Sequence, residues 1–350
     1  MKSGKFASRR LTLPCVVAAG MLSSFGFQQA FAETSADTAA VPDAAARATW
    51  RAAMSHNPES GAGCFTATYP SFAWEQTACK VVHPKLRRAQ KPTPDQLLVT
   101  GNGNDYVVQG TGLISETIGS FPSVSDVTSE RSAGVAAFGD GGILGKNEYS
   151  LQINTDFNGT TAACAGHSGC VVWQQFVYAT DYETAGEAAV FIEYWLIGWG
   201  SSSCPSGWES DGAGDCVVNS NATTAPDVAP TTASLAAMTF TGSAVSGGND
   251  TAVFNNGTTA YSFSAPDSVV DIAQVWQQSE FNIVGDAGGS RADFNRGASI
   301  TVKVAVTDGS TSAPSCVADS GTTGETNNLN LGSCSTSSGS TPSIQFTESD

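Results

Sequence analysis

From residue 99 onward, hydrophobic residues come in short runs that polar residues separate, a pattern of strands and turns. The runs are rich in β-branched and aromatic residues, and Gly, Asn, Asp and Ser separate them. This pattern predicts strands at 106–108, 149–153, 171–178, 190–199, 234–240, 252–254, 261–263, 279–284, 299–306 and 343–346.

Helical periodicity is weak by comparison. Residues 43–51 are expected to form one helix, and residues 267–278 a turn or two. Many short strands with turn signals and no helical crossovers predict an all-β domain, either a sandwich or a barrel. The roughly 250 residues from 99 to 350 are enough for one such domain with its own core.

The run at 190–199 is the most apolar of these strands. Alternation places Phe191, Glu193 and Trp195 on one face, with Tyr194 and Leu196 on the other, so the strand is expected to be covered on both sides. Glu193 is then a carboxylate among aromatic rings, where burial favours the neutral form that a functional acid requires. The alternative is a structural hydrogen bond at the rim.

The N-terminus has the features of a signal peptide. Basic residues precede an apolar run at 11–27, and the A-x-A sequence Ala30-Phe31-Ala32 follows. We therefore predict a signal peptide over 1–32 and a secreted protein, in an extracellular or periplasmic space. The apolar run is too short and too broken for a membrane span, and we expect no membrane partner.

Eight of the nine cysteines remain once Cys15 leaves with the signal peptide. An even number in an exported chain predicts disulfides, and nearest-neighbour pairing is the simplest connectivity. Zinc is the competing interpretation, but there is no C-x-x-C, so we expect no metal and no cofactor. The predicted pairs are Cys64 with Cys79, Cys164 with Cys170, Cys204 with Cys216, and Cys316 with Cys334.

Charge is distributed unevenly along the chain. Residues 99–350 carry five Lys and Arg against 26 Asp and Glu, a difference of −21. Such a surface repels nucleic acid and anionic membranes. It also repels itself near neutral pH, and in acid this repulsion fades as the carboxylates become protonated. The composition suits acidic surroundings, although acidity for solubility alone is an equally ordinary explanation.

The segment 33–98 differs from the rest of the chain. Its first part, from residue 33 to about residue 60, is rich in Ala, Thr and Ser, and a basic, proline-punctuated stretch follows at 83–94 that we interpret as a linker. A basic leader can pair with an acidic body and mask a site until it is cut away. The alternative is a small appendage that stays attached. The domain at 99–350 is expected to be catalytic.

Most hydrolytic machinery is absent from the sequence. A Ser-His-Asp or Cys-His device needs an imidazole, but His56 and His83 precede the main domain and His167 lies in the short 164–170 loop. An aspartic peptidase needs two carboxylates from paired Asp-Thr/Ser-Gly loops, and the sequence has one such triplet, Asp-Ser-Gly. The H-E-x-x-H motif of metallopeptidases is absent from the sequence. If the protein is an enzyme, carboxylate and amide side chains are the remaining candidates for catalysis.

Two stretches resemble the eqolisin family of glutamic peptidases. Residues 151–157 (Leu-Gln-Ile-Asn-Thr-Asp-Phe) are similar to the family's strand that reads Leu-Gln, a few residues, Asp-Phe. Residues 278–284 (Gln-Ser-Glu-Phe-Asn-Ile-Val), with Ala-Asp-Phe at 292–294, are similar to its Ala-Glu-Trp-Ile-Val-Glu segment and the Ala-Asp-Phe beyond. By this resemblance Gln152 is the catalytic glutamine and Glu280 the catalytic glutamate.

The resemblance also implies substrate-binding positions. The family's strand of Trp, Tyr and Glu has two counterparts here, 173–176 (Trp-Gln-Gln-Phe) and 191–195 (Phe-Ile-Glu-Tyr-Trp), and we favour the second because it retains a carboxylate. The chain departs from the family at Phe281, where Trp is usual, and at Gly285, where an acid is usual. The expected substrate-binding residues are Glu193, Trp195, Asp156 and Trp173.

The fold and activity that the resemblance implies are specific. The implied fold is an antiparallel two-sheet β-sandwich of the concanavalin-like jelly-roll type. The implied activity is that of an acid-acting endopeptidase that uses no metal, that pepstatin does not inhibit and whose partner is a polypeptide substrate. The protein is expected to be a monomer. Ionised Glu280 would take a proton from the attacking water, and the Gln152 amide would stabilise the oxyanion. The segment 33–98 would be the propeptide of a zymogen, cut near Arg87 and Arg88.

Two other functions fit parts of the pattern. A carbohydrate-binding or adhesive module would stack sugars on Trp195, Trp199 and Trp208, with Ca²⁺ at Asp211 and Asp215 or, alternatively, a plain loop there. A glycoside hydrolase would use Glu193 and Glu280 as its two carboxylates. Side-chain geometry separates these possibilities: a glutamic peptidase needs the amide of Gln152 and the carboxylate of Glu280 in one cleft.

Overall fold

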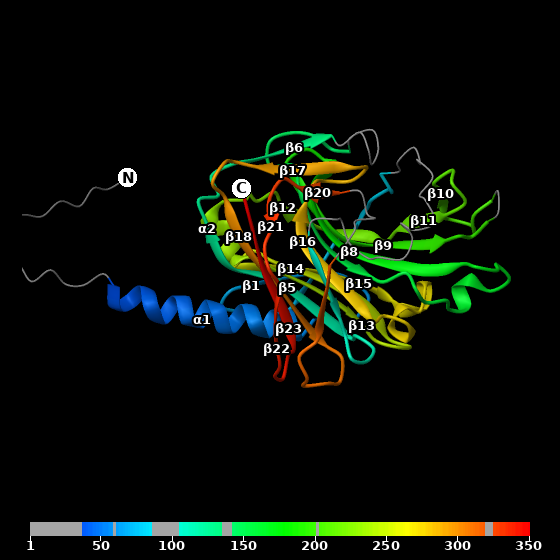
Figure 1. Cartoon of the computed structure of the whole chain (residues 1–350), viewed down its shortest axis with the longest axis horizontal. Coiled ribbons are helices and arrows are strands. Elements are labelled where there is room, and N and C mark those ends of the chain that lie inside the picture. Colours follow the sequence, from blue (N-terminus) through cyan, green and yellow to red (C-terminus); the bar gives the residue numbers. More distant parts are fainter. Residues whose placement is uncertain (1–36, 59–60, 86–104, 135–141, 201–202, 319–324) are drawn as a thin grey trace, which may run out of the picture. The chain divides into compact units, whose positions relative to one another are not determined.

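Antiparallel strands make up most of the regular structure, and they form two large sheets (Figure 1). The structure is a computed structural model that describes residues 37–58, 61–85, 105–134, 142–200, 203–318 and 325–350, with side chains from residue 43 onward. Residues 42–350 form one compact unit. Of the separate unit 1–41, only the start of a helix is described. The predicted signal peptide at 1–32 lies outside the described residues.

Each large sheet is assembled from segments that are distant in sequence. Sheet 1 has the order β2 (Glu75–Thr77), β1 (Gly63–Thr68), β15 (Thr259–Pro266), β14 (Asn249–Asn255), β13 (Thr239–Ala244), β5 (Glu116–Ser125), β18 (Ser299–Thr307), β23 (Ser343–Ser349) and β21 (Asn330–Leu331), with β22 (Ser335–Ser337) beside β23. Sheet 2 has the order β10 (Glu209–Ser210), β11 (Cys216–Asn219), β9 (Glu187–Ile197), β8 (Val171–Thr184), β7 (Ser150–Thr155), β16 (Gln278–Val284), β4 (Tyr106–Gln109) and β19 (Ser315–Ala318), with β12 (Asn221–Pro226) between β9 and β3 (Lys80–Val81).

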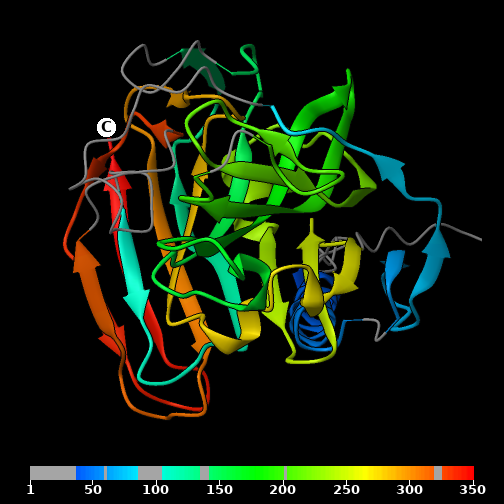
Figure 2. The same ribbon diagram turned by 90° about the vertical axis from the view of Figure 1, so that its right-hand side faces the viewer.

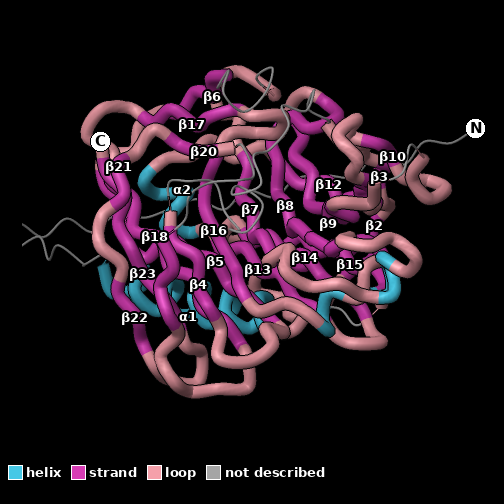
Figure 3. The backbone as a smooth tube through the Cα atoms, turned by 45° about the vertical axis from the view of Figure 1, so that its right-hand side comes forward, coloured by secondary structure: helices cyan, strands magenta, loops and turns pink. Residues whose placement is uncertain are grey.

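The remaining elements are short. A small sheet has the order β20 (Thr326–Asn327), β17 (Ser290–Phe294) and β6 (Glu130–Gly134). The helices are α1 (Asp37–His56), α2 (Thr232–Ala237) and the 3₁₀ turns η2 (Ala162–Cys164), η3 (Asp267–Val269) and η4 (Ile272–Gln274). Figure 3 shows how far strands outnumber helices in the described chain.

Sheets 1 and 2 pack face to face through alternate side chains. The ring of Phe281 on β16 lies 5.3 Å from that of Phe121 on β5, and the rings of Tyr178 and Phe254 lie 3.9 Å apart. Gly119 makes the first contact possible, because a Cβ there would come within 2.1 Å of the Phe281 ring. The all-β, two-sheet antiparallel sandwich predicted from the sequence is thereby confirmed.

The other face of sheet 1 is covered by the part of α1 that follows residue 42. Trp50 and Met54 belong to one buried cluster with residues of β1, β14 and β15, and Arg51 donates to the carbonyl of Ala237 at 2.9 Å. Figure 2 views this helix nearly end-on, beside the yellow strands. One face of sheet 1 packs against α1 and its other face packs against sheet 2. The outward face of sheet 2 is therefore the sheet face on which we look for a functional site.

One strand prediction is wrong and several strands were not predicted. Residues 234–240 were expected to be extended, but the chain forms α2 before β13 starts. Thr231 explains the difference, because its side chain accepts from the backbone N–H of Ser234 while the Ser234 side chain accepts from that of Thr231, a reciprocal helix cap. The strand prediction missed β1, β5 and β6, which contain several Gly, Ser and Thr, and also β17.

The N-terminal segment contributes strands to both large sheets. β1 pairs with β15 along its whole length, and β3 pairs with β12. The expected separation of 33–98 from the sandwich therefore needs correction for residues 63–81. Removal of the segment as a propeptide stays a prediction, and the cleavage point near Arg87 and Arg88 lies outside the described residues.

All four predicted disulfides are present with nearest-neighbour pairing. Each closes a local loop or hairpin, and such bonds persist in oxidising compartments rather than in the cytosol. None of the described helices is long and apolar enough to cross a lipid bilayer.

Candidate active site

Gln152 and Glu280 lie on neighbouring antiparallel strands at the centre of sheet 2. In the register of β7 with β16, Asn154 stands opposite Glu280 and Asn282 opposite Gln152. The alternate residues on both strands, such as Leu151 and Phe281, belong to the core between the sheets. Gln152, Asn154, Glu280 and Asn282 therefore share the outward face, and Gln152 and Glu280 are diagonal neighbours there.

The two side chains are buried, but among polar groups. Glu280 is 1% exposed and Gln152 is 6% exposed. Asn154 joins them, because its Nδ2 donates to Glu280 Oε2 at 2.7 Å and lies 3.5 Å from Gln152 Oε1. Burial of these groups is tolerable because hydrogen bonds replace those lost to water.

Gln152 is held at both ends of its amide. Its Nε2 donates to Ser150 Oγ at 2.9 Å, and its Oε1 accepts from Gln175 Nε2 at 3.3 Å. Ser150 in turn donates its hydroxyl proton to the carbonyl of Gly285 at 2.8 Å. An amide nitrogen carries two N–H groups, so one remains after the bond to Ser150, and it is the kind of donor that a developing oxyanion needs.

A second carboxyl lies close to Glu280. Burial raises the pKa of Glu348 to about 8, and the charge of Glu280 adds to this, while hydrogen bonds from Asn282 and Asn327 oppose it. The two amides donate to its carboxyl oxygens at 2.8 and 3.0 Å. At acidic pH Glu348 is neutral, which removes electrostatic repulsion from an ionised Glu280.

Asp156 ties the end of β7 to the start of β16. Its Oδ2 accepts from the backbone N–H groups of Gln277 and Gln278, at 3.2 and 3.1 Å. Burial raises its pKa to about 7, although these two hydrogen bonds act in the other direction. These contacts go to the backbone two and three residues before Glu280, so they fix the strand that carries it. A role in binding substrate stays a prediction.

An aromatic row lies beside the pair. The ring of Trp173 on β8 is 5.7 Å from that of Trp195 on β9 and 6.0 Å from that of Phe157. The indole N–H of Trp195 donates to Glu193 Oε1 at 2.8 Å and to Gln175 Oε1 at 3.2 Å. Trp173 and Trp195 lie on β8 and β9, the two strands next to β7 on this side of the sheet, and their contact with substrate stays a prediction.

The two stretches that the sequence offered as counterparts of the family's strand lie on β8 and β9. β8 pairs with β7, and β9 lies one strand further away. Of the two counterpart stretches, 173–176 is therefore adjacent to Gln152, and Gln175 rather than Glu193 contacts it. The preference for 191–195 as the counterpart of the family's strand, made because that stretch retains a carboxylate, stays a prediction.

Three residues of this site were not predicted: Asn154, Gln175 and Glu348. Alternation along 151–157 was a sufficient signal for Asn154, since it lies two residues after Gln152 and must share its face. Gln175 was in the rejected stretch. Glu348 has no signal in the sequence, because it lies 66 residues from its partner Asn282.

The geometry is unfavourable for a glycoside hydrolase. Glu193 and Glu280 share the outward face, but β8 and β7 lie between their strands. Three strand spacings separate them by about 14 Å, whereas paired glycosidase carboxylates lie within about 10 Å.

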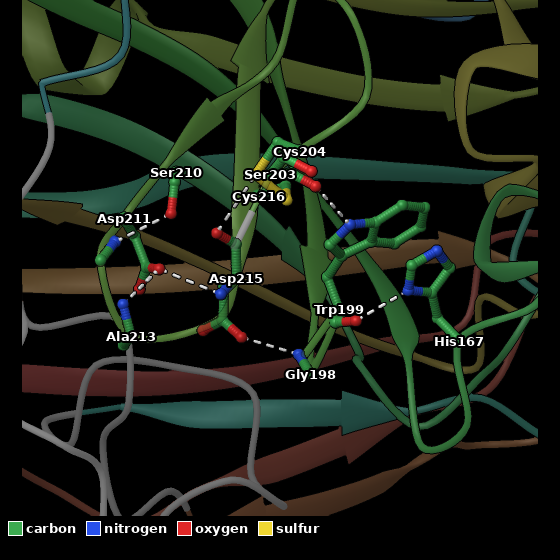
Figure 4. Close-up of a disulfide and its surroundings, with 11 residues drawn as sticks. His167, Gly198, Trp199, Ser203, Cys204, Ser210, Asp211, Ala213, Asp215 and Cys216 are labelled. Carbon is green, nitrogen blue, oxygen red and sulfur yellow. Dashed lines mark hydrogen bonds between the residues drawn. A yellow bond between two sulfur atoms is a disulfide. The ribbon is translucent and has the colours of Figure 1, made fainter. Parts of the chain in front are cut away.

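The loop closed by Cys204 and Cys216 fits a structural role rather than a Ca²⁺ site (Figure 4). Asp211 Oδ1 accepts from the backbone N–H groups of Ala213 and Asp215, and Asp215 Oδ1 from that of Gly198 at 2.7 Å. Among the described residues, no group of His, Cys, Asp and Glu has an arrangement suited to a metal ion.

Trp199 is not an open platform for a sugar ring. His167 stacks on its indole with ring centroids 3.3 Å apart, and the Nδ1 of His167 lies 2.8 Å from the Trp199 carbonyl oxygen (Figure 4). One face of the ring is therefore occupied by a side chain of the protein itself, which weakens the case for stacking on Trp199 in a carbohydrate-binding module.

These observations define a class of protein, namely a two-sheet sandwich that carries a glutamine and a glutamate on adjacent strands of one sheet face. No protein-family model matches the chain, and no curated protein does. Its structure is similar to two solved structures of glutamic peptidases. One is SCP-B, a member of the eqolisin family, in a complex with the tripeptide Ala-Ile-His (13% identity, TM-score 0.31). The other is scytalido-glutamic peptidase with a transition-state analogue inhibitor (13% identity, TM-score 0.30). Each match covers 71% of this chain and 99% of the other.

Proposed function

We propose that this protein is a secreted glutamic endopeptidase that hydrolyses polypeptides in acid. The observation that carries the proposal is the shared outward face of β7 and β16, where Asn154 links the amide of Gln152 to the carboxylate of Glu280. The sequence motifs around both residues support the same assignment.

The pair supplies both functions that peptide hydrolysis needs. Ionised Glu280 accepts a proton from a water molecule as the water oxygen attacks the scissile carbonyl carbon. The N–H of Gln152 that is not bonded to Ser150 stabilises the negative oxygen of the tetrahedral intermediate. Glu280 then gives its proton to the leaving amine as the C–N bond breaks, and returns to the ionised form.

Acidic working conditions follow from the rest of the molecule. The main domain carries a large excess of carboxylates, and burial raises the pKa of Glu130, Glu148 and Glu348 to about 8. These three groups are neutral in acid and become charges in buried or half-buried surroundings as the pH rises, so the folded state suits acid.

The contacts of residues 80–85 support a propeptide. Lys80 pairs with Glu187, and Lys85 with Glu183 at 3.7 Å. Val82 belongs to a buried cluster with Val177, which stands opposite Gln152 in the β7–β8 register. The leader therefore reaches the outward face of sheet 2 beside the pair, where it would restrict access until it is cut away. The four disulfides fit the secretion that the signal sequence predicts.

The activity is tested with the purified protein after acid activation, at about pH 4, where an ordinary carboxylate is partly ionised. A denatured protein substrate should be digested, and neither pepstatin nor a chelator should stop digestion. Glu280→Gln should reduce kcat by at least about 100-fold without a change in the circular dichroism spectrum. Full activity of Glu280→Gln would remove the assignment. A folded, inactive protein that binds oligosaccharides would favour the carbohydrate-binding alternative.

A further inference from the structure

Three side-chain amides lie in contact on the outward face of sheet 2. Gln152 and Asn154 come from β7, and Gln175 comes from β8. Each amide has an oxygen that only accepts and a nitrogen that only donates, so each can be arranged in two orientations. Which orientation each adopts decides whether Gln152 presents N–H or oxygen to a substrate, and whether Glu280 meets a donor or an acceptor.

Trp195 fixes one end of this set. An indole N–H can only donate, and that of Trp195 is shared between Glu193 Oε1 at 2.8 Å and Gln175 Oε1 at 3.2 Å, so the atom of Gln175 that faces it is an acceptor. The Nε2 of Gln175 must then face β7, where it donates to Asn154 Oδ1 at 2.8 Å and to Gln152 Oε1 at 3.3 Å. With its oxygen so engaged, Asn154 turns its Nδ2 to Glu280.

Ser150 fixes the other end independently. Its hydroxyl proton goes to the carbonyl of Gly285, so its oxygen is left to accept. The group of Gln152 that faces it must be Nε2, as the bond of 2.9 Å requires. Both ends thus assign the same orientation to Gln152, with its oxygen toward Gln175 and its nitrogen toward Ser150.

Burial makes these orientations firm. Gln175 is 5% exposed and Asn154 is 1% exposed, so water has little access to replace a lost bond. A reversed amide would bring two oxygens or two N–H groups together in a buried place, at a cost of about 1–3 kcal/mol for each unsatisfied group.

We propose that Trp195, Gln175 and Asn154 form a one-way hydrogen-bond relay that positions the catalytic pair. The relay orients Gln152 so that its nitrogen can donate to a substrate. It also gives Glu280 a hydrogen-bond donor that favours the ionised form of its carboxylate. The proposal rests on the proposed function. The three side chains are positioning residues, since they act through Gln152 and Glu280. It gives Trp195 a role different from the substrate contact that the sequence predicted.

Three variants interrupt the relay at successive points. Trp195→Phe removes the N–H and keeps a ring beside Trp173, Gln175→Met removes the amide, and Asn154→Leu removes the donor to Glu280. Each should lower kcat, by roughly tenfold for Trp195→Phe and up to roughly 100-fold for Asn154→Leu, and should leave KM within about twofold. The acidic limb of the kcat profile should move to higher pH in Asn154→Leu, because the ionised base has lost its donor.

Non-additivity separates a relay from three independent contacts. The double variant Trp195→Phe/Gln175→Met should be no slower than Gln175→Met alone, within about a factor of two, because in the relay the indole reaches Gln152 and Asn154 through the Gln175 amide. Trp199→Phe is the matched control, since it removes an indole N–H that donates to Ser203 outside the site. It should keep the wild-type kcat and pH profile.

Several outcomes would overturn the relay. They are losses that multiply in the double variant, an acidic limb that does not move, or an effect on KM alone, which would mean that these side chains touch substrate. If Asn154→Leu does not fold, the Trp195 and Gln175 variants still decide through the double variant. Failure of the proposed function looks different, because then either the wild-type protein digests no substrate in acid or Glu280→Gln remains active whatever the relay variants do.

Discussion

At the scale of single residues, the site combines buried carboxyl groups with side-chain amides that donate hydrogen bonds to them. Glu280 accepts from the Asn154 amide, and Glu348 accepts from two further amides. Amides satisfy a carboxylate without adding a cation, so they leave it available as a base. In the proposed mechanism a neutral Glu348 beside an ionised Glu280 gives the two carboxyl groups distinct roles.

Asp156 gives a prediction at this scale. Asp156→Asn keeps an oxygen for the two backbone N–H groups, so stability in acid, where Asp156 is already neutral, should change little. Asp156→Ala leaves both N–H groups buried and should lower the free energy of unfolding by about 1–3 kcal/mol in urea titrations at acidic pH. It should also lower kcat, because the start of β16 loses its attachment.

The two variants also test the substrate-binding role that the sequence predicted for Asp156. A several-fold rise in KM for Asp156→Asn, with unchanged stability, would indicate contact with substrate and contradict the structural role.

At the scale of elements, the sequence predicted the strands that carry the site better than those that support it. β7 and β16 were found because hydrophobic alternation is regular there and the motifs are local. β5 was missed because it contains Gly119, a residue that is unfavourable in strands. Glycine is needed there because the Phe281 ring of β16 packs against this position, and the sequence of β5 alone does not reveal that contact. The order of strands in sheet 2 was not predictable either, and that order decides that Gln175, rather than Glu193, contacts Gln152.

At the scale of the whole molecule, buried carboxyl groups decide how stability depends on pH. Burial raises the pKa of Glu130 from an ordinary value of 4.5 to about 8, with the nearby charges of Glu148 and Asp293 adding to it. Between these two values the folded state binds more protons than the unfolded state, so the free energy of unfolding falls as pH rises. The stabilisation is complete below about pH 4.5 and is lost through about pH 8.

We therefore expect the Tm, followed by calorimetry, to be highest in acid and to fall steadily from about pH 4.5 to pH 8. Glu130→Gln and Glu348→Gln should each make this fall shallower, because a neutral amide cannot ionise. Glu209→Gln, at an exposed position on β10, is the matched control and should leave the slope unchanged. A Tm that rises with pH over this window would contradict the account.

The most direct test of the central claim is a kinetic cycle of Gln152→Ala, Glu280→Gln and the double variant, with kcat measured at acidic pH. Two groups that act on one water molecule lose their effect together, so the double variant should be no more than about tenfold slower than the slower single variant. Losses that multiply across the cycle, or a single variant that keeps its activity, would show that the amide and the carboxylate do not work as a pair.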